Sequence, residues 1–313
     1  MDISADHQGP NHLLASESPL VKLFTTHDEN VFHGRITIST RRQFMKQLTY
    51  GSAAVTALSA RSHLRAAGAG ERLRTAMIGL GDQGSSLLNS YLDLDGVDVT
   101  YVCDPDESRL ARARAKANNR PRAVTDLRRV LDDKSVDAVV IATPDHWHAP
   151  AAILAREAGK HVYVEKPCSH NLLESRWLLN AARKNNVVVQ HGTNMRTNPS
   201  IAGAVQILRE GRIGDVLMAK AWNVQRRNNI GRHQPSSPPD SVGYDMWVGP
   251  AEMVPFQENR FHYNWHWWYN FGTGDIGNDG AHEIDYARWG LGVTGLPSKV
   301  MAVGGKYFHD DDE

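Results

Sequence analysis

The segment at residues 77–84, M-I-G-L-G-D-Q-G, constrains the fold most strongly, because it places G-x-G-x-x-G directly after a short apolar run. In such a motif Gly79 permits the tight turn from strand to helix, and Gly81 lets the backbone approach a pyrophosphate. Gly84 lets the following helix pack closely on the strand. Amide groups at the helix start then face the phosphates, and the helix dipole adds positive potential. A glycine-rich turn that binds no ligand can have the same sequence, so the flanking sequence must distinguish such a turn from a dinucleotide site.

The flanking sequence has the order that a dinucleotide site requires, with a strand, a helix and a second strand that ends in an acid. Asp104 provides this acid about 20 residues beyond Gly84, where a carboxylate binds the ribose hydroxyls. A carboxylate there would repel the 2′-phosphate of NADP, so we expect NAD, with NADP less favoured. Leu80 and Gln83 complete the predicted cofactor turn. The strand, helix and second strand are expected at residues 74–78, 85–94 and 97–102.

Short apolar strands continue to alternate with helical segments up to about residue 192. The apolar run at residues 136–142 is typical of a strand that is covered on both faces. This alternation predicts an α/β fold with a doubly wound parallel sheet, whose ligands lie beyond the carboxyl ends of the strands. Helices are expected at residues 109–117, 126–131, 150–158 and 172–185, and strands at 161–165 and 187–190. Besides the glycine motif and Asp104, the expected cofactor-binding residues are Thr143, Pro144, His146, Glu165 and Lys166.

Composition excludes several classes of protein. The 313 residues include 35 Lys plus Arg and 35 Asp plus Glu, so no net charge favours nucleic acid or an anionic membrane as a partner. Cys103 and Cys168 lack the spacing of a metal site or a disulfide framework. We interpret both as small buried residues, and leave open a functional thiol at Cys168 because of the site beside it. His146 and His148 alternate without a third suitably spaced ligand, so no metal site is expected.

The first 69 residues are interpreted as a leader. Arg41 and Arg42 precede a modestly apolar run at residues 48–60 and then A-G-A at residues 67–69. This order resembles a twin-arginine export signal, in which a receptor reads the arginine pair and the apolar run is too short for a stable membrane span. An amphipathic surface helix that begins with two arginines is the alternative. We therefore expect the twin-arginine export machinery as a partner and the periplasm as the location.

The character of the sequence changes after residue 192, so we assign residues 70–192 to a dinucleotide-binding domain and 193–313 to a second domain. In the second domain we expect a helix at 201–210, strands at 216–224 and 299–303, and a helix through His282. An aromatic run at residues 261–271 includes Trp265, which would bind substrate if this run stacks on sugar rings. Packing in a core or at a subunit interface explains the run equally well.

The motifs together resemble the Gfo/Idh/MocA oxidoreductase family. The resemblance rests on the glycine motif, Asp104, the segments A-T-P at 142–144 and E-K-P at 165–167, and the H-x-x-D segment at 282–285, in this order and spacing. It implies a Rossmann domain followed by an α+β domain with an open, mostly antiparallel sheet that faces the nicotinamide. We expect that sheet to be incomplete at the C-terminus, because the chain stops early. Sheets of this family often pair face to face, which implies a homo-oligomer.

The resemblance also implies the catalytic residues, Lys166 in E-K-P and His282 in H-x-x-D. Alcohol oxidation needs a base for the hydroxyl proton and a group that stabilises the alkoxide, and these two side chains fit that need. Asn278 stands where many members carry a catalytic Asp, and an amide would orient the imidazole of His282 without sharing its proton. With Asp279 it completes the expected substrate site. The alternatives without a catalytic role are that Lys166 is a surface lysine beside a turn proline, and that His282 is a helix residue whose ring is hydrogen-bonded to a carbonyl.

The sequence therefore predicts an exported NAD-dependent oxidoreductase that transfers a hydride between a sugar or cyclitol hydroxyl carbon and nicotinamide. One alternative is a glycosidase in which bound NAD oxidises C3 transiently, so that elimination breaks the glycosidic bond. Another is a binding protein that retains the nucleotide and the sugar but has no turnover.

Overall fold

The computed structural model describes residues 72–184 and 187–313 of the chain. The predicted leader with Arg41 and Arg42 lies outside these residues, so it stays a prediction. Among the residues described, no helix combines the length and the apolar character that crossing a membrane requires.

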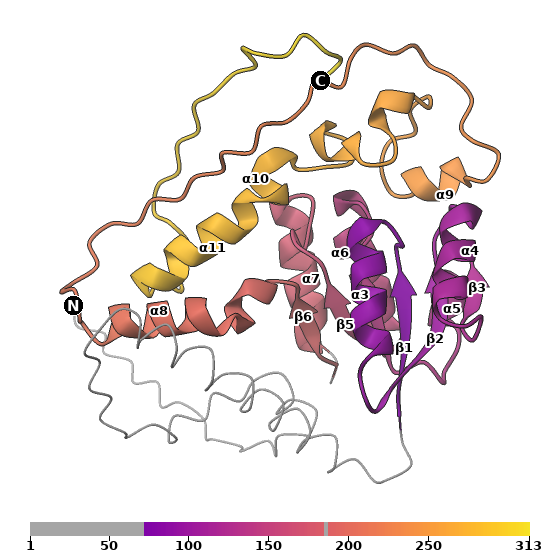
Figure 1. Ribbon diagram of the computed structural model, residues 1–313, viewed down its shortest axis with the longest axis horizontal. Coiled ribbons are helices and arrows are strands. Elements are labelled where there is room, and N and C mark those ends of the chain that lie inside the picture. The colour runs from indigo at the N-terminus through magenta and orange to yellow at the C-terminus, as the bar shows by residue number, and fades with distance from the viewer. Residues whose placement is uncertain (1–71, 185–186) are drawn as a thin grey trace, which may run out of the picture. The chain divides into compact units, whose positions relative to one another are not determined.

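A six-stranded parallel sheet forms the first part of the described chain (Figure 1). The strand order is β3-β2-β1-β4-β5-β6, so the chain starts in the middle of the sheet and builds outward in both directions. The carboxyl ends of β1 and β4 therefore form the crevice where ligands bind to such sheets. The strands are β1 Leu73–Ile78, β2 Val97–Cys103, β3 Arg122–Val124, β4 Ala138–Ile141, β5 His161–Val164 and β6 Val189–His191.

Helices cover both faces of this sheet, which confirms the predicted doubly wound fold. Ile78 and Ile141 belong to one buried cluster, covered by α5, α6 and α7, because alternate residues of a strand face the same side. Met77 and Val140 belong to the other cluster, covered by α3 and α4. The helices are α3 Asp82–Leu92, α4 Glu107–Lys116, α5 Arg128–Leu131, α6 Asp145–Glu157 and α7 Leu172–Lys184.

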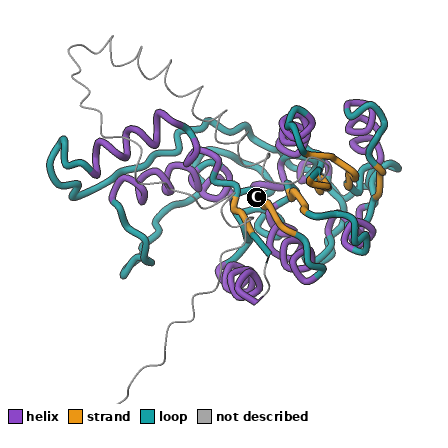
Figure 2. The backbone as a smooth tube through the Cα atoms, turned by 90° about the horizontal axis from the view of Figure 1, so that it is seen from below, coloured by secondary structure: helices purple, strands orange, loops and turns teal. Residues whose placement is uncertain are grey.

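The second part of the described chain is built from helices and long connections. In Figures 1 and 2, α8 and α11 lie side by side, and a Cβ atom placed on Gly290 would be 3.4 Å from Cδ1 of Leu208. The elements are the 3₁₀ turn η1 Asn194–Thr197, α8 Pro199–Arg209, α9 Tyr244–Val248, the turns η2 Glu258–Arg260 and η3 Asn264–Trp267, α10 Gly274–Asn278 and α11 Gly280–Leu291.

The strands expected at residues 216–224 and 299–303 are not formed in the structure. Both segments run as extended chain, and within the described ranges neither hydrogen-bonds to a neighbouring strand as part of a sheet. Their apolar side chains are consequently exposed, as in Leu217 at 90% and Val303 at 90%. A β-strand is stable only with a hydrogen-bonded partner, so the apolar pattern alone does not produce the open antiparallel sheet.

The aromatic run contributes to a third buried cluster. Trp265 and Phe271 pack there against Trp247 and Val248 of α9. The ring centroids of Trp247 and Phe271 are 4.9 Å apart. Core packing therefore accounts for part of the run, while Tyr263 lies in the wall of the cavity described below and Tyr269 is exposed.

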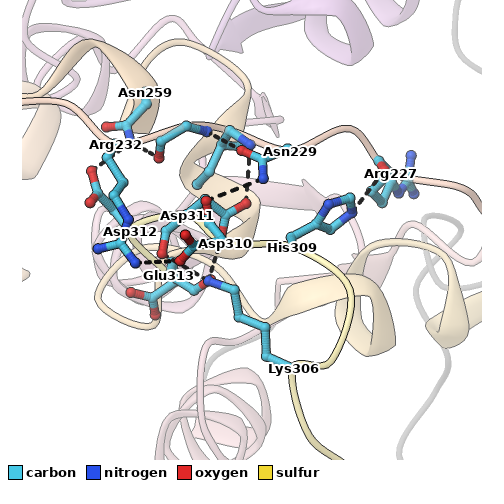
Figure 3. Close-up of polar contacts among 12 residues, drawn as sticks. Arg227, Asn229, Arg232, Asn259, Lys306, His309, Asp310, Asp311, Asp312 and Glu313 are labelled. Carbon is cyan, nitrogen blue, oxygen red and sulfur yellow. Dashed lines mark hydrogen bonds and ion pairs between the residues drawn. The ribbon is translucent and has the colours of Figure 1, made fainter.

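The acidic residues at 310–312 fold back onto the loop at 227–233 (Figure 3). The carboxylate of Asp311 accepts from the backbone N–H of Ile230 at 3.1 Å, and that of Asp312 accepts from the N–H of His233 at 2.8 Å. His309 contacts the carbonyl of Arg227 at 3.1 Å. These contacts fix the loop that carries Arg227 toward α10.

Candidate active site

A cavity of about 440 Å³ lies at the carboxyl ends of β1, β2, β4 and β5 and extends to the aromatic segment. Of the predicted site residues, Gly79, Gly81, Gln83, Asp104, Thr143, Pro144, Glu165, Lys166, Trp265 and Asn278 line it. Leu80, Gly84, His146, Asp279 and His282 do not. The wall also contains residues that the sequence did not point to, among them Arg109, His262 and His266.

The glycine motif has the geometry of a phosphate cradle. A Cβ atom on Gly84 would lie 1.9 Å from the carbonyl oxygen of Gly79, and one on Gly79 would lie 2.5 Å from that of Ala142. A Cβ atom on Gly81 would meet only the guanidinium of Arg109, at 3.5 Å, so its backbone is open to the cavity. No side chain caps the first turn of α3, whose amide groups remain free for an anion. The loop therefore fits the pyrophosphate of a dinucleotide.

Asp104 fixes the glycine loop as well as lining the cavity. Its two carboxylate oxygens accept from the backbone N–H groups of Leu80 at 2.7 Å and Asp106 at 2.9 Å. Burial raises the pKa of this carboxyl, and the two amide groups together with the Arg109 guanidinium oppose that shift. A carboxylate oxygen accepts more than one hydrogen bond, so Asp104 can still receive a ribose hydroxyl.

Arg109 is a cavity residue that the sequence analysis missed. It lies in the first turn of α4, and its guanidinium extends back over Gly81. Asp106 lies 3.9 Å from its Nε, and burial lowers the pKa of the guanidinium, which stays a cation. The sequence could have indicated this place, because Arg109 lies about one turn beyond Asp104 at the end of β2. Side chains in the first turn of a helix point back toward the end of the preceding strand.

Glu165 joins the glycine loop to β5. It accepts from Nε2 of Gln83 at 2.9 Å and from the hydroxyl of Tyr163 at 3.1 Å, both through Oε1. Its second oxygen accepts from the backbone N–H of Lys166 at 3.1 Å. The carboxylate is buried, so these three donors fix the start of E-K-P relative to the cofactor loop.

Lys166 projects into the cavity and contacts Asn278 of α10. Its ammonium donates to the backbone carbonyl of Asn278 at 2.6 Å and to the side-chain oxygen at 3.2 Å. Asn278 ends α10 whereas His282 belongs to α11, so the two do not share one helix as expected. The side-chain oxygen of Asn278 thus positions Lys166, and the predicted orientation of His282 by this amide is not what the structure shows.

Two acidic residues of the Asn278–Asp285 segment, Asp279 and Asp285, are held by arginines. Arg227 makes a two-pronged contact with Asp275 of α10 and also contacts Asp279. Arg196 of η1 binds Asp285 through Nε at 2.8 Å and Nη2 at 2.7 Å, and so fixes α11 to the carboxyl end of the sheet. Asp279 and Asp285 therefore hold the segment in place, while His282 lies on the first turn of α11, outside the cavity wall.

His146 contacts backbone carbonyls and does not line the cavity, and its contact with the cofactor stays a prediction. Its ring nitrogens lie 3.3 Å from the carbonyl of Phe271 and 3.2 Å from that of Trp247. Burial lowers its pKa to about 4. His148, by contrast, lines the cavity and lies 2.8 Å from the carbonyl of Thr143. Both rings connect the start of α6 to neighbouring backbone.

The two cysteines carry no sign of a thiolate role. Cys103 is buried and Cys168 is half-buried, and burial raises the pKa of both thiols. Within residues 72–184 and 187–313, no group of three or more His, Cys, Asp or Glu side chains is arranged to hold a metal ion.

Comparison with known proteins places both parts of the chain in one enzyme family. The model described as "Oxidoreductase family, NAD-binding Rossmann fold" matches residues 73–193. The model described as "Oxidoreductase family, C-terminal alpha/beta domain" matches residues 220–311.

Levoglucosan dehydrogenase of Pseudarthrobacter phenanthrenivorans is 27% identical over 239 residues, which cover 74% of this chain and 54% of that protein. A glycosyl hydrolase family 109 protein of Shewanella sp. strain ANA-3 is 30% identical over 159 residues, 48% of this chain and 35% of the relative. The chain thus spans about half the length, or less, of these curated relatives. Among solved structures, levoglucosan dehydrogenase in complex with NADH and levoglucosan superposes with a TM-score of 0.53 at 26% identity, covering 71% of this chain and 55% of that one.

Proposed function

Because the chain belongs to the Gfo/Idh/MocA oxidoreductase family and carries its NAD-binding Rossmann fold, we propose that it transfers a hydride between a sugar or cyclitol hydroxyl carbon and NAD. The relatives that act on carbohydrates support this choice of substrate. A polyol also suits the cavity, whose wall combines aromatic rings such as those of Trp247 and Trp265 with many polar and charged side chains.

One observation carries the proposal: the Lys166 ammonium lies in the same cavity as the glycine loop, with Asn278 fixing its direction. Two of its three N–H groups donate to Asn278, which leaves one donor for the oxygen of a substrate. A cation held in this way stabilises the negative charge that develops on a hydroxyl oxygen as its proton leaves.

NAD supplies the hydride acceptor when it is bound. The chain's own residues bind its pyrophosphate at the Gly81 amide and the first turn of α3, and its ribose at Asp104. Thr143 and Pro144 at the end of β4 form the adjoining wall. The proton of the substrate hydroxyl needs a base, a role that the family resemblance implies for His282.

The second candidate is glycoside cleavage through transient oxidation at C3. The similarity of residues in the Rossmann part to a glycosyl hydrolase family 109 protein favours it. The same cofactor site and the same lysine would serve both reactions.

The test is incubation of the full chain with NAD and a panel of sugars, cyclitols and aryl glycosides, levoglucosan included. Net formation of NADH is the expected result. Release of the aglycone without net NADH would replace this proposal by the glycosidase, and saturable sugar binding with neither product would replace it by a binding protein.

We further propose that the protein is exported by the twin-arginine route to the periplasm and assembles as a homo-oligomer. Replacing Arg41 and Arg42 by Lys preserves charge but removes the pair that the receptor reads, so the protein should stay in the cytoplasm. Unchanged periplasmic protein in cell fractions of this variant would contradict the twin-arginine route, and a monomer in sedimentation experiments would contradict assembly.

A further inference from the structure

We propose that His266 is a catalytic residue of this site, which accepts the proton of the substrate hydroxyl during oxidation and returns it during reduction. This role rests on the proposed oxidoreductase function, and it gives to His266 the proton transfer that the family resemblance implies for His282. Four features carry it: the place of the ring in the cavity, its tautomer, its rigid support and the charges that face it.

His266 shares the cavity wall with Lys166 and Asn278. It lies in η3, and α10, which carries Asn278, packs against that turn. His282 does not line this cavity. His148 and His262 also line it, but both ring nitrogens of His148 contact backbone carbonyls. His262 contacts the carboxylate of Asp106 through Nε2, and its Nδ1 is buried. We therefore consider the imidazole of His266 as the base.

The tautomer of His266 is determined by the backbone carbonyl of Tyr263, three residues earlier in the chain. Nδ1 lies 2.5 Å from the carbonyl oxygen of Tyr263, which can only accept, so Nδ1 carries the proton. Nε2 then has a free lone pair. A base of this kind needs its other nitrogen fixed by an acceptor, and the Tyr263 carbonyl provides that.

The position of the ring is rigid. The ring of Trp265 stacks on it with centroids 3.6 Å apart, and that of Tyr263 lies at 4.6 Å. Gly272 packs against the backbone of His266, since a Cβ atom placed on Gly272 would lie 2.4 Å from the carbonyl oxygen of His266. A proton acceptor must be held in one geometry to act efficiently, and this packing holds it.

The charges that face His266 favour the neutral ring. Burial lowers its pKa, and the Lys166 ammonium and the Arg227 guanidinium lower it further. Asp145 of α6 opposes them, as does the Tyr263 carbonyl, and the hydroxyl of Thr273 donates to that carboxylate at 2.6 Å. Arg227 is itself paired with Asp275 and Asp279 of the α10 segment. The ring is therefore neutral at neutral pH and ready to accept a proton.

The reaction balances with these groups. The O–H bond of the substrate breaks and its proton goes to Nε2 of His266, while the hydrogen on the same carbon leaves with its electron pair to oxidised nicotinamide. The carbon–oxygen double bond forms, NAD is reduced, and Lys166 stabilises the oxygen while it is negative. The imidazolium then releases the proton to solvent.

The test compares His266→Gln and His282→Gln, with His233→Gln at an exposed loop position as the matched control. We expect His266→Gln to lower turnover by about 10²-fold at unchanged affinity for NADH, and to remove the acid limb of the pH–rate profile. Imidazole added to His266→Ala should restore part of the turnover. Normal turnover and an unchanged limb in His266→Gln would overturn the role, and so would a limb lost only in His282→Gln.

A second readout does not depend on activity. Titration of the histidine resonances by NMR should show a higher pKa for His266 in Lys166→Met than in the wild type, because the facing ammonium is removed. An unchanged pKa of His266 in Lys166→Met would contradict the placement of His266 and Lys166 in one site. If no polyol of the panel supports reduction of NAD by the wild type, the proposed function is overturned. The proton-transfer role is then overturned with it, even if the pKa of His266 shifts in the titration.

Discussion

Two glycines of the cofactor loop allow folding and cofactor binding to be separated by matched substitutions. In Gly84→Ala the new methyl group would lie 1.9 Å from the carbonyl oxygen of Gly79, which belongs to the backbone and cannot rotate away. The end of β1 and the start of α3 must then move apart. Overpacking of this kind costs about 1–3 kcal/mol, and we expect the upper end of that range because both partners are backbone.

Gly81→Ala provides the contrast. Gly81 has φ −65°, which alanine adopts without strain, and its nearest neighbour is the movable guanidinium of Arg109 at 3.5 Å. The free energy of unfolding of the Gly81→Ala protein should equal that of the wild type or exceed it by up to about 1 kcal/mol. The methyl group does, however, stand where a pyrophosphate must approach the backbone. NADH should therefore bind at least about tenfold more weakly, a loss of about 1.4 kcal/mol.

Urea denaturation followed by circular dichroism, and fluorescence titration with NADH, measure the two quantities. With an m-value of about 3 kcal/mol per M, Gly84→Ala should lower the urea midpoint by about 1 M. A Gly84→Ala protein with the wild-type midpoint would refute the packing argument. A Gly81→Ala protein that binds NADH like the wild type would refute the assignment of the loop to the pyrophosphate.

Lys166→Met should lower turnover by about 10²-fold or more while NADH affinity stays unchanged, because it removes the cation that stabilises the alkoxide; steady-state rates and NADH titration measure both. Arg109→Met should weaken NADH binding about tenfold and reduce its dependence on salt, as titrations at two ionic strengths would show. Asp285→Asn should cost about 1 kcal/mol in urea denaturation, a modest value because the side chain of its partner Arg196 is 45% exposed. Burial lowers the pKa of His146 to about 4, against 6.5 in the unfolded chain, so the free energy of unfolding has its full value above pH 6.5 and falls toward pH 4. His146→Leu should therefore reduce the loss of this free energy between pH 7.5 and pH 5 by about 2 kcal/mol.

The parallel sheet could be predicted from sequence because its signals are local. The apolar run at 136–142 became β4 Ala138–Ile141, and the glycine motif marked the turn into α3. The start of α6 could not be predicted in this way. The helix was expected at residues 150–158, but α6 begins at Asp145 and contains Pro150. Contacts of its first turn with residues more than 100 positions away stabilise the earlier start.

The position of Lys166 in the cavity wall was predictable, because the single motif E-K-P points to it. Its partners were less accessible, because the contact between Lys166 and Asn278 joins residues 112 positions apart. Arg196 and His266 acquire their roles only through packing with other segments. The expected strands at 216–224 and 299–303 failed for the same reason, because pairing depends on a partner that the pattern itself does not provide.

The contacts that hold the far wall of the cavity end on backbone carbonyls. His146 contacts the carbonyls of Trp247 and Phe271, Trp147 donates to that of Trp247 at 3.1 Å, and His170 lies 3.1 Å from that of Gly272. A carbonyl is present whatever side chain the residue carries. The side chain at 247, which lines the cavity, can therefore change without loss of these anchors, so this part of the wall can be reshaped while its backbone stays in place.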